Sequence, residues 1–243
     1  MRLPLFCLLL LIPSLLRGEE GSPPAETVLQ EMEQTYRALR SYADTSAVAF
    51  RNPDETEGAR VEFKIWFTRP HFFRLDATTH STPEAKPLRE VMWFDGQAAR
   101  MWSTTMPVVT RSKIQLAGSK MFGSYAYHIP TLLEPSYAGP KRLNELTSPT
   151  LLEDEQVDGT DCYHVRGEWL SDPYELWIGK GDHLVRKILA SYHGYLMEET
   201  HRELKPNLPI DPATFRFAPE EEMGPAKKGT PPPRLPGEHR RPS

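Results

Sequence analysis

Few residues in this chain of 243 have the types and spacing that metal binding requires. Cys162 and His164 stand two positions apart, which places both side chains on one face of a strand. A Cys-x-His pair nevertheless lacks the further ligands that a zinc site needs. His193 and His201 are eight positions apart and do not complete such a set. We therefore expect neither a metal site nor a cofactor.

Acidic residues give no better indication of catalysis. Glu198 and Glu199 are adjacent in a predicted strand, so their side chains point to opposite faces and cannot cooperate as a carboxylate pair. The chain contains no Gly-x-Ser-x-Gly, His-Glu-x-x-His or glycine-rich phosphate loop. We expect that the protein is not an enzyme, and a hydrolase with an unrecognised site is the lowest-ranked alternative.

The first structural element that could position a site is an N-terminal helix. Ser22 is followed by two prolines and Glu26, which is the composition of a helix start. Apolar residues then recur at spacings of three and four as far as Leu39. This pattern predicts an amphipathic helix that ends near Tyr42.

The rest of the domain has the composition of β-strands separated by turns. Two short helices are expected between residues 110 and 133, where this character fades. A sheet of about ten or eleven strands with helices indicates an α+β fold, and so long an antiparallel sheet curls. The predicted strands are 45–51, 59–69, 72–79, 89–95, 98–104, 151–157, 161–169, 173–179, 182–192 and 195–204, with 215–217 as a further edge pairing.

The clearest alternation of side chains runs from residue 60 to residue 67. Val61, Phe63, Ile65 and Phe67 alternate with a largely polar set. Since successive side chains of a strand point to opposite faces, one face of this strand is predicted to be apolar and the other polar.

The two ends of the chain differ from this domain. Residues 1–21 have a basic start, an apolar run of fourteen residues and a polar end, which is the pattern of a signal peptide. The run is shorter than the roughly 20 residues of a membrane-spanning helix. Residues 219–243 are rich in proline and charge, and we expect a disordered tail there. The folded domain is therefore predicted at 22–218.

Charge and cysteine content narrow the function classes. The net charge is −4, without the Lys/Arg runs of a nucleic-acid-binding protein. Removal of the signal would leave Cys162 as the only thiol, so no intramolecular disulfide is expected. These features favour an exported, monomeric protein whose stability comes from a packed core.

The order of elements and four local strings resemble the periplasmic lipoprotein carrier LolA and its relatives. The strings run in order along roughly residues 25 to 220. They are Ile-Trp-Phe-Thr-Arg-Pro-His-Phe-Phe-Arg at 65–74, Phe-Asp-Gly-Gln at 94–97, Leu-Trp-Ile-Gly-Lys at 176–180 and Asn-Leu-Pro-Ile-Asp-Pro-Ala-Thr-Phe-Arg-Phe at 207–217.

The resemblance implies an incomplete barrel, closed by an N-terminal helix and short lid helices over an apolar cavity. In LolA the cavity takes up acyl chains, the arginine of an R-P-x-x-F motif bonds to the lid, and the phenylalanine lies at the cavity. The matching residues here are Arg69, as the lid-closing residue, and Phe73. The alternation adds the remaining candidates for ligand binding, which are Phe63, Ile65, Phe67 and Leu75.

These observations predict a periplasmic carrier that holds a lipid or lipoprotein acyl chain and makes transient contact with a membrane. The alternative is an envelope sensor or interaction module that uses the same fold to bind an envelope protein. Ordinary core packing is the other interpretation of the apolar set, and a structural arginine at a strand end is the other interpretation of Arg69.

Overall fold

The structure is a computed structural model that describes residues 22–82, 84–111, 128–137, 143–169, 171–192 and 194–220. The predicted signal peptide, most of the predicted tail, and residues 112–127 of the predicted helical segment lie outside the described residues. The elements are α1 (Ala25–Ala38), β1 (Ser41–Arg51), β2 (Glu57–Thr68), β3 (Phe72–His80), β4 (Leu88–Asp95), β5 (Ala99–Ser103), β6 (Met106–Arg111), α3 (His128–Leu133), η2 (Pro135–Tyr137), β7 (Thr147–Leu151), β8 (Glu155–Val157), β9 (Thr160–Trp169), β10 (Asp172–Gly179), β11 (Val185–Tyr192), β12 (Tyr195–Arg202) and η3 (Pro212–Phe215).

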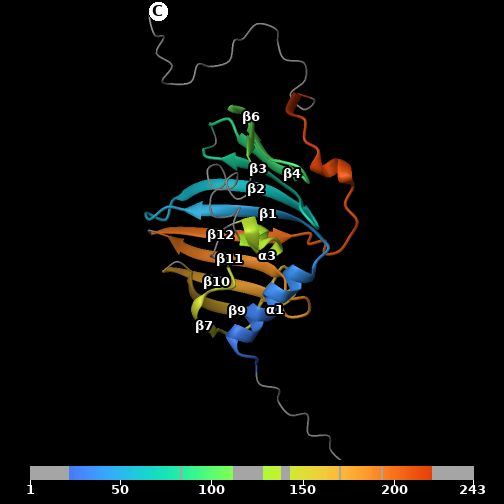
Figure 1. Cartoon of the computed structure of the whole chain (residues 1–243). Helices are drawn as coiled ribbons and strands as arrows, with labels where there is room; N and C mark the ends of the chain where they lie inside the picture. The colour runs from blue at the N-terminus through green and yellow to red at the C-terminus, as the bar shows by residue number, and fades with distance from the viewer. Residues whose placement is uncertain are drawn as a thin grey trace, which may run out of the picture.

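The strands form one curved sheet that does not close into a barrel (Figure 1). Their order is β6-β5-β4-β3-β2-β1-β12-β11-β10-β9-β7, with β8 paired to β9, and the pairings are antiparallel. The first and last long strands, β1 and β12, therefore meet in the middle. The predicted α+β fold with a strongly curved antiparallel sheet is confirmed.

Two details of the predicted sheet differ from the structure. Within the described residues the observed sheet has twelve strands, because the predicted strand 151–157 is replaced by β7 and β8 and because β6 extends the sheet beyond β5. The predicted edge pairing at 215–217 is wrong. Phe215 ends the short helix η3, and the following residues cross the outer face of the sheet instead of pairing with a strand.

The N-terminal helix ends earlier than predicted, at Ala38 rather than near Tyr42. Leu39 has an extended backbone (ψ 131°), and from Ser41 onward the chain pairs with β2. The backbone N–H of Arg40 donates to the side chain of Asn207 at 2.8 Å, which holds this turn. Tyr42 therefore lies in β1, where it pairs with Phe67 of β2. The apolar spacing that predicted a longer helix continues past the end of α1, but the residues there form a strand.

The concave face of the sheet carries the main core. Val61, Phe63, Ile65 and Phe67 are each at most 2% exposed and belong to one apolar cluster, which confirms the predicted alternation. Figure 1 shows α1 and α3 on the same side of the sheet, with α3 in front of β1 and β12. All six residues of α3 are buried.

A second, small apolar cluster lies on the outer face. There the ring of Phe217 packs against Trp93 and Trp102 at centroid distances of 5.1 and 5.4 Å. The Arg74 guanidinium lies 5.0 Å from the Phe217 ring and donates to the Thr214 carbonyl at 3.1 Å. The C-terminal segment is thus fastened over β3, β4 and β5, away from the concave face.

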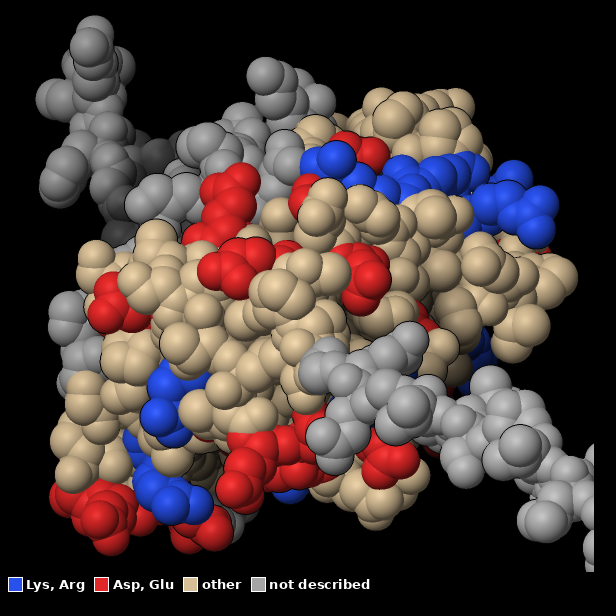
Figure 2. All heavy atoms as spheres, turned by 90° about the horizontal axis from the view of Figure 1, so that it is seen from below, with Lys and Arg blue, Asp and Glu red and all other residues tan. Residues whose placement is uncertain are grey.

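The charged residues do not form a single continuous field on the face seen from below (Figure 2). Lys and Arg side chains gather mainly near its margins, Asp and Glu are scattered over the rest, and uncharged residues fill much of the surface between them. No helix in the described part of the chain has both the length and the apolar character needed to cross a membrane.

Candidate functional site

The predicted ligand-binding side chains lie together on the concave face, on β2 and β3. Ile65 pairs with Leu75 and Phe67 pairs with Phe73 across the two strands. All four are 0% exposed, and Phe63 is 2% exposed. The ring of Phe73 also lies edge-on to that of Tyr137 in η2, at 5.0 Å. The five residues thus form one continuous apolar patch that packs beneath the helical layer.

Three hollows in the described part of the chain do not coincide with this patch. One of about 550 Å³ lies on the outer face across β12, β1, β2 and β3, over side chains such as Ala47, Lys64 and Trp66. Phe63 borders it. Two others, of about 200 and 480 Å³, are lined by residues outside the patch. The remaining four patch residues border none of the three and are packed against their neighbours.

Arg69 stands at the edge of the patch and joins the two helices above it. Its Nε donates to the Leu39 carbonyl at 2.8 Å, and its Nη2 donates to the carbonyls of Arg37 and Leu133, each at 2.9 Å. Its guanidinium lies 5.1 Å from the ring of Phe67. A single side chain thus connects the end of α1, the end of α3 and the apolar patch.

The chemistry of helix ends explains why arginine suits this position. The last carbonyls of a helix have no partner within it and carry partial negative charge. Arginine supplies several N–H donors in a fixed plane together with a positive charge. Glu134, just after α3, adds an ion pair with Arg69 at 4.0 Å. Arg69 thus bonds to the ends of both helices, and its role as a lid-closing residue stays a prediction.

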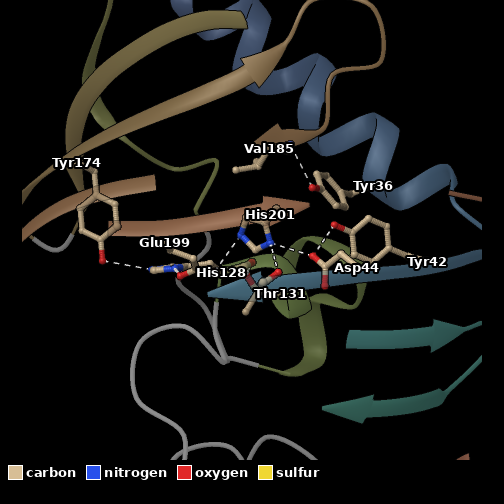
Figure 3. Close-up of polar contacts among 10 residues, drawn as sticks. Tyr36, Tyr42, Asp44, His128, Thr131, Tyr174, Val185, Glu199 and His201 are labelled. Atoms are coloured by element: carbon tan, nitrogen blue, oxygen red, sulfur yellow. Dashed lines mark hydrogen bonds and ion pairs between the residues drawn. The ribbon is translucent and has the colours of Figure 1, made fainter. Parts of the chain in front are cut away.

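A stripe of buried polar side chains crosses the middle of the concave face (Figure 3). Asp44 comes from β1, Glu199 and His201 come from β12, and His128 is the first residue of α3. The side chains of all four are 0% exposed. Because β1 and β12 are the central strands, this polar stripe lies between the apolar side chains of β2 and β3 and those of β10 and β11.

The polar stripe is a chain of hydrogen bonds and ion pairs. Nδ1 of His128 lies 2.5 Å from Oε2 of Glu199, and Nε2 of His201 lies 3.0 Å from the other oxygen, Oε1. Nδ1 of His201 lies 2.8 Å from Oδ2 of Asp44, which also accepts from the hydroxyl of Tyr42 at 2.8 Å. Nε2 of His128 lies 3.4 Å from the hydroxyl of Tyr174 on β10.

Neighbouring charges set the protonation of the central pair. Burial alone would raise the pKa of Glu199, but the charge and hydrogen bond of His128, together with the ion pair with His201, outweigh it and lower the pKa to about 2. Burial alone would lower the pKa of His201, but its hydrogen bond to Asp44 and its ion pair with Glu199 raise the pKa to about 9. At neutral pH the pair is therefore a carboxylate and an imidazolium.

The polar stripe is incompletely satisfied. Among the described residues, Oδ1 of Asp44, Oε1 of Glu199 and Nε2 of His201 have no hydrogen-bond partner. The last two atoms are close enough for an ion pair but are not aligned for a hydrogen bond. Buried polar atoms without partners are rare and costly, so each needs an explanation.

The other residues considered from the sequence lie apart from this site. His164 is held by Glu175 at 2.7 Å and stacks on Trp177, and the Cys162 thiol donates to a backbone carbonyl. Glu198 faces away from Glu199 and pairs with Lys187 at 3.1 Å, as the alternation predicts. His193 lies outside the described residues. In the described ranges, no group of three or more His, Cys, Asp or Glu is placed to hold a metal ion.

Sequence reasoning missed the polar stripe. Its bonds join residues 71 and 157 positions apart, which local spacing cannot reveal. One local signal was present, because Asp44 and Ser46 share a face of β1, and Glu199 and His201 share a face of β12. In each of these two central strands, a pair of polar residues on the buried face indicated that polar groups meet in the core.

A family model matches residues 25–222 of the chain and is described as "Predicted periplasmic protein (DUF2092)". This description confirms the periplasmic location expected from the sequence. No curated protein sequence matches the chain.

Several solved structures have a similar fold. LprF from Mycobacterium bovis is 12% identical, with a TM-score of 0.51, over 78% of this chain and 97% of LprF. The lipoprotein LppX from Mycobacterium tuberculosis is 14% identical, with a TM-score of 0.48, over 77% of this chain and 97% of LppX. The LolA superfamily protein NE2245 from Nitrosomonas europaea is 11% identical, with a TM-score of 0.36, over 81% of this chain and 99% of that protein. The similarity to LprF, the one of these three with a TM-score above 0.5, shows a shared fold.

Proposed function

The chain belongs to the DUF2092 family of predicted periplasmic proteins, and we propose that it is a carrier that holds a lipid, or the acyl chains of a lipoprotein, on its concave face. The observation that carries this proposal is the position of Arg69. This side chain fastens the ends of α1 and α3 directly over the apolar patch. In the proposal α3 is the lid, and Arg69 holds it closed.

The apolar patch determines what the open form can bind. Uncovering the patch would expose side chains whose burial contributes about 1.5–3 kcal/mol each. Opening to water alone is therefore unfavourable, whereas an apolar ligand that replaces α3 restores the burial. Acyl chains are flexible and apolar, and they fit a contiguous apolar surface without needing polar partners.

A pair of adjacent phenylalanines provides a matched test. Phe73 lies in the patch, and Phe72 points to the other face, where its ring packs on Phe215 at 5.6 Å. We expect the wild-type protein to bind a fluorescent acyl probe. Phe73→Leu should weaken the affinity for the probe several-fold, and Phe72→Leu should leave the affinity unchanged. Circular dichroism of each variant checks that it is folded.

The lid has its own readout in the same experiment. Hydrogen exchange of the α3 amides should become faster when the probe is added, because the ligand replaces α3 on the apolar patch. The amides of the central strands should stay protected. Equal effects of the two phenylalanine variants, or no uptake of probe, would argue against the carrier. A protein that takes up no probe but retains one crosslinked envelope protein would instead support the interaction module.

A further inference from the structure

We propose that Asp44 and Glu199 form a headgroup subsite that selects amphiphiles with hydrogen-bond-donating groups, such as an ammonium, hydroxyl or amide N–H, over amphiphiles with an anionic headgroup. This inference rests on the proposed carrier function and specifies the ligand class. It starts from the polar stripe, which a surface for acyl chains alone does not require.

The position of the polar stripe suits the polar part of an amphiphile. Phe63 and Ile65 lie on one side of the stripe, on β2, and Leu176 and Ile188 lie on the other side, on β10 and β11. A ligand on the concave face therefore meets apolar side chains in both directions and polar atoms only between them. A headgroup placed at the stripe leaves acyl chains free to run along either half.

In the closed form the lid itself supplies a donor to this subsite. His128 on α3 donates to Oε2 of Glu199 at 2.5 Å, and both side chains are fully buried. If α3 lifts, Glu199 loses this partner while it remains in an apolar surrounding. Leaving a buried carboxylate with one partner fewer is strongly unfavourable. A ligand that brings its own donor removes this penalty, and a ligand without one does not.

Two buried oxygens without a hydrogen bond point to the same class of ligand. Oδ1 of Asp44 and Oε1 of Glu199 are buried acceptors that have no hydrogen bond in the described part of the chain. Without His128, two carboxyl groups face the single imidazole of His201. A donor headgroup satisfies these oxygens, whereas a carboxylate or phosphate adds a like charge beside them.

Three ligands with one oleyl or oleoyl chain and different headgroups test the proposal. Oleylamine and monooleoylglycerol carry donors at neutral pH, and oleate carries an anion. Each displaces a fluorescent acyl probe from the intact protein. We expect the amine and the glyceride to bind at least tenfold more tightly than oleate, a difference of about 1.4 kcal/mol. Oleate binding as tightly as oleylamine and monooleoylglycerol overturns the subsite.

Glu199→Gln and Glu198→Gln provide the matched pair of variants. Both remove one negative charge from β12, but Glu198 faces outward and pairs with Lys187. We expect Glu199→Gln to reduce the preference for oleylamine over oleate at least tenfold, and Glu198→Gln to retain it. Equal effects would assign the preference to net charge and contradict the subsite.

The test remains decisive if Glu199→Gln does not fold. The comparison of headgroups on the wild-type protein needs no variant, and Asp44→Asn offers a second substitution in the polar stripe, with the same expected loss of preference. The outcomes also separate the two proposals. Uptake of all three ligands with equal affinity refutes the subsite and leaves the carrier standing, whereas uptake of none refutes the carrier.

Discussion

Replacing Arg69 with alanine should loosen the lid more than it loosens the sheet. The substitution removes three hydrogen bonds of 2.9 Å or less, of which one goes to α3 at Leu133 and two go to the chain at the end of α1. The helix-end carbonyls that lose a partner become exposed to water as α3 lifts. The local opening of α3 should therefore become more frequent while the central strands stay paired.

The size of the effect follows from those bonds. A hydrogen bond to a charged group contributes about 1.5–3 kcal/mol when it is well buried. The Arg69 side chain is 32% exposed, so a contribution of about 1 kcal/mol for each bond is appropriate here. We expect a loss of about 3 kcal/mol in the free energy of unfolding. Loss of the bond to Leu133 alone, worth about 1 kcal/mol, should make opening of α3 about five times more frequent.

Urea denaturation followed by circular dichroism measures the first effect, and hydrogen exchange at the amides of Leu133 and Glu134 measures the second. Arg69→Lys keeps the charge but cannot reach three carbonyls, and it should show most of the loss. Arg60→Ala is the matched control, since Arg60 lies on the outer face of β2 and is 61% exposed. Unchanged exchange in α3 together with accelerated exchange in β1 would refute the lid role of Arg69.

Two further predictions concern the polar stripe and the C-terminal segment. The pKa of Glu199 falls from 4.5 to about 2 on folding, so its stabilising effect is complete above pH 4.5 and is lost as the pH falls towards 2. The pKa of His201 rises from 6.5 to about 9, so its effect is complete below pH 6.5 and is lost towards pH 9. The two contributions are therefore both complete only between pH 4.5 and 6.5. Urea denaturation measured from about pH 2 to about pH 9 should show that Glu199→Gln flattens the acidic limb, below pH 4.5, and that His201→Gln flattens the alkaline limb, above pH 6.5. Unchanged limbs would contradict the charge assignment. Phe217→Ala should lower the free energy of unfolding by about 3 kcal/mol and shift the fluorescence of Trp93, because the two rings are in contact. The affinity for the acyl probe should stay unchanged, because Phe217 packs on the outer face. A loss of affinity would place the ligand on that face instead.

The fold could be predicted from the sequence where local patterns match tertiary burial. Val61 to Phe67 alternate because β2 has one face in the core, so the pattern predicted both the strand and its inward face. The helix end could not be placed in the same way. Tyr42 continues the apolar spacing of α1, but the sheet pairing of β1 determines its conformation.

The site was predictable only in its apolar half. Phe73 and Arg69 belong to a short motif that can be matched residue by residue; Arg69 bonds to the ends of α1 and α3, and Phe73 packs against Tyr137 of η2, while their roles in ligand binding and lid closing stay predictions. The polar stripe depends on the contact of His128 of α3 with Glu199 of β12, and on the pairing of β1 with β12, which brings Asp44 to His201. No local pattern marks such a contact, because its partners lie far apart in the chain.

The most direct test of the carrier is to identify what the protein holds after purification from the periplasm without detergent. Native mass spectrometry of the wild-type protein should show a bound amphiphile with at least one acyl chain, which is released on denaturation. The bound amount should fall in Phe73→Leu and persist in Phe72→Leu. A wild-type protein that is consistently free of lipid, and that takes up no acyl ligand added afterwards, would contradict the account.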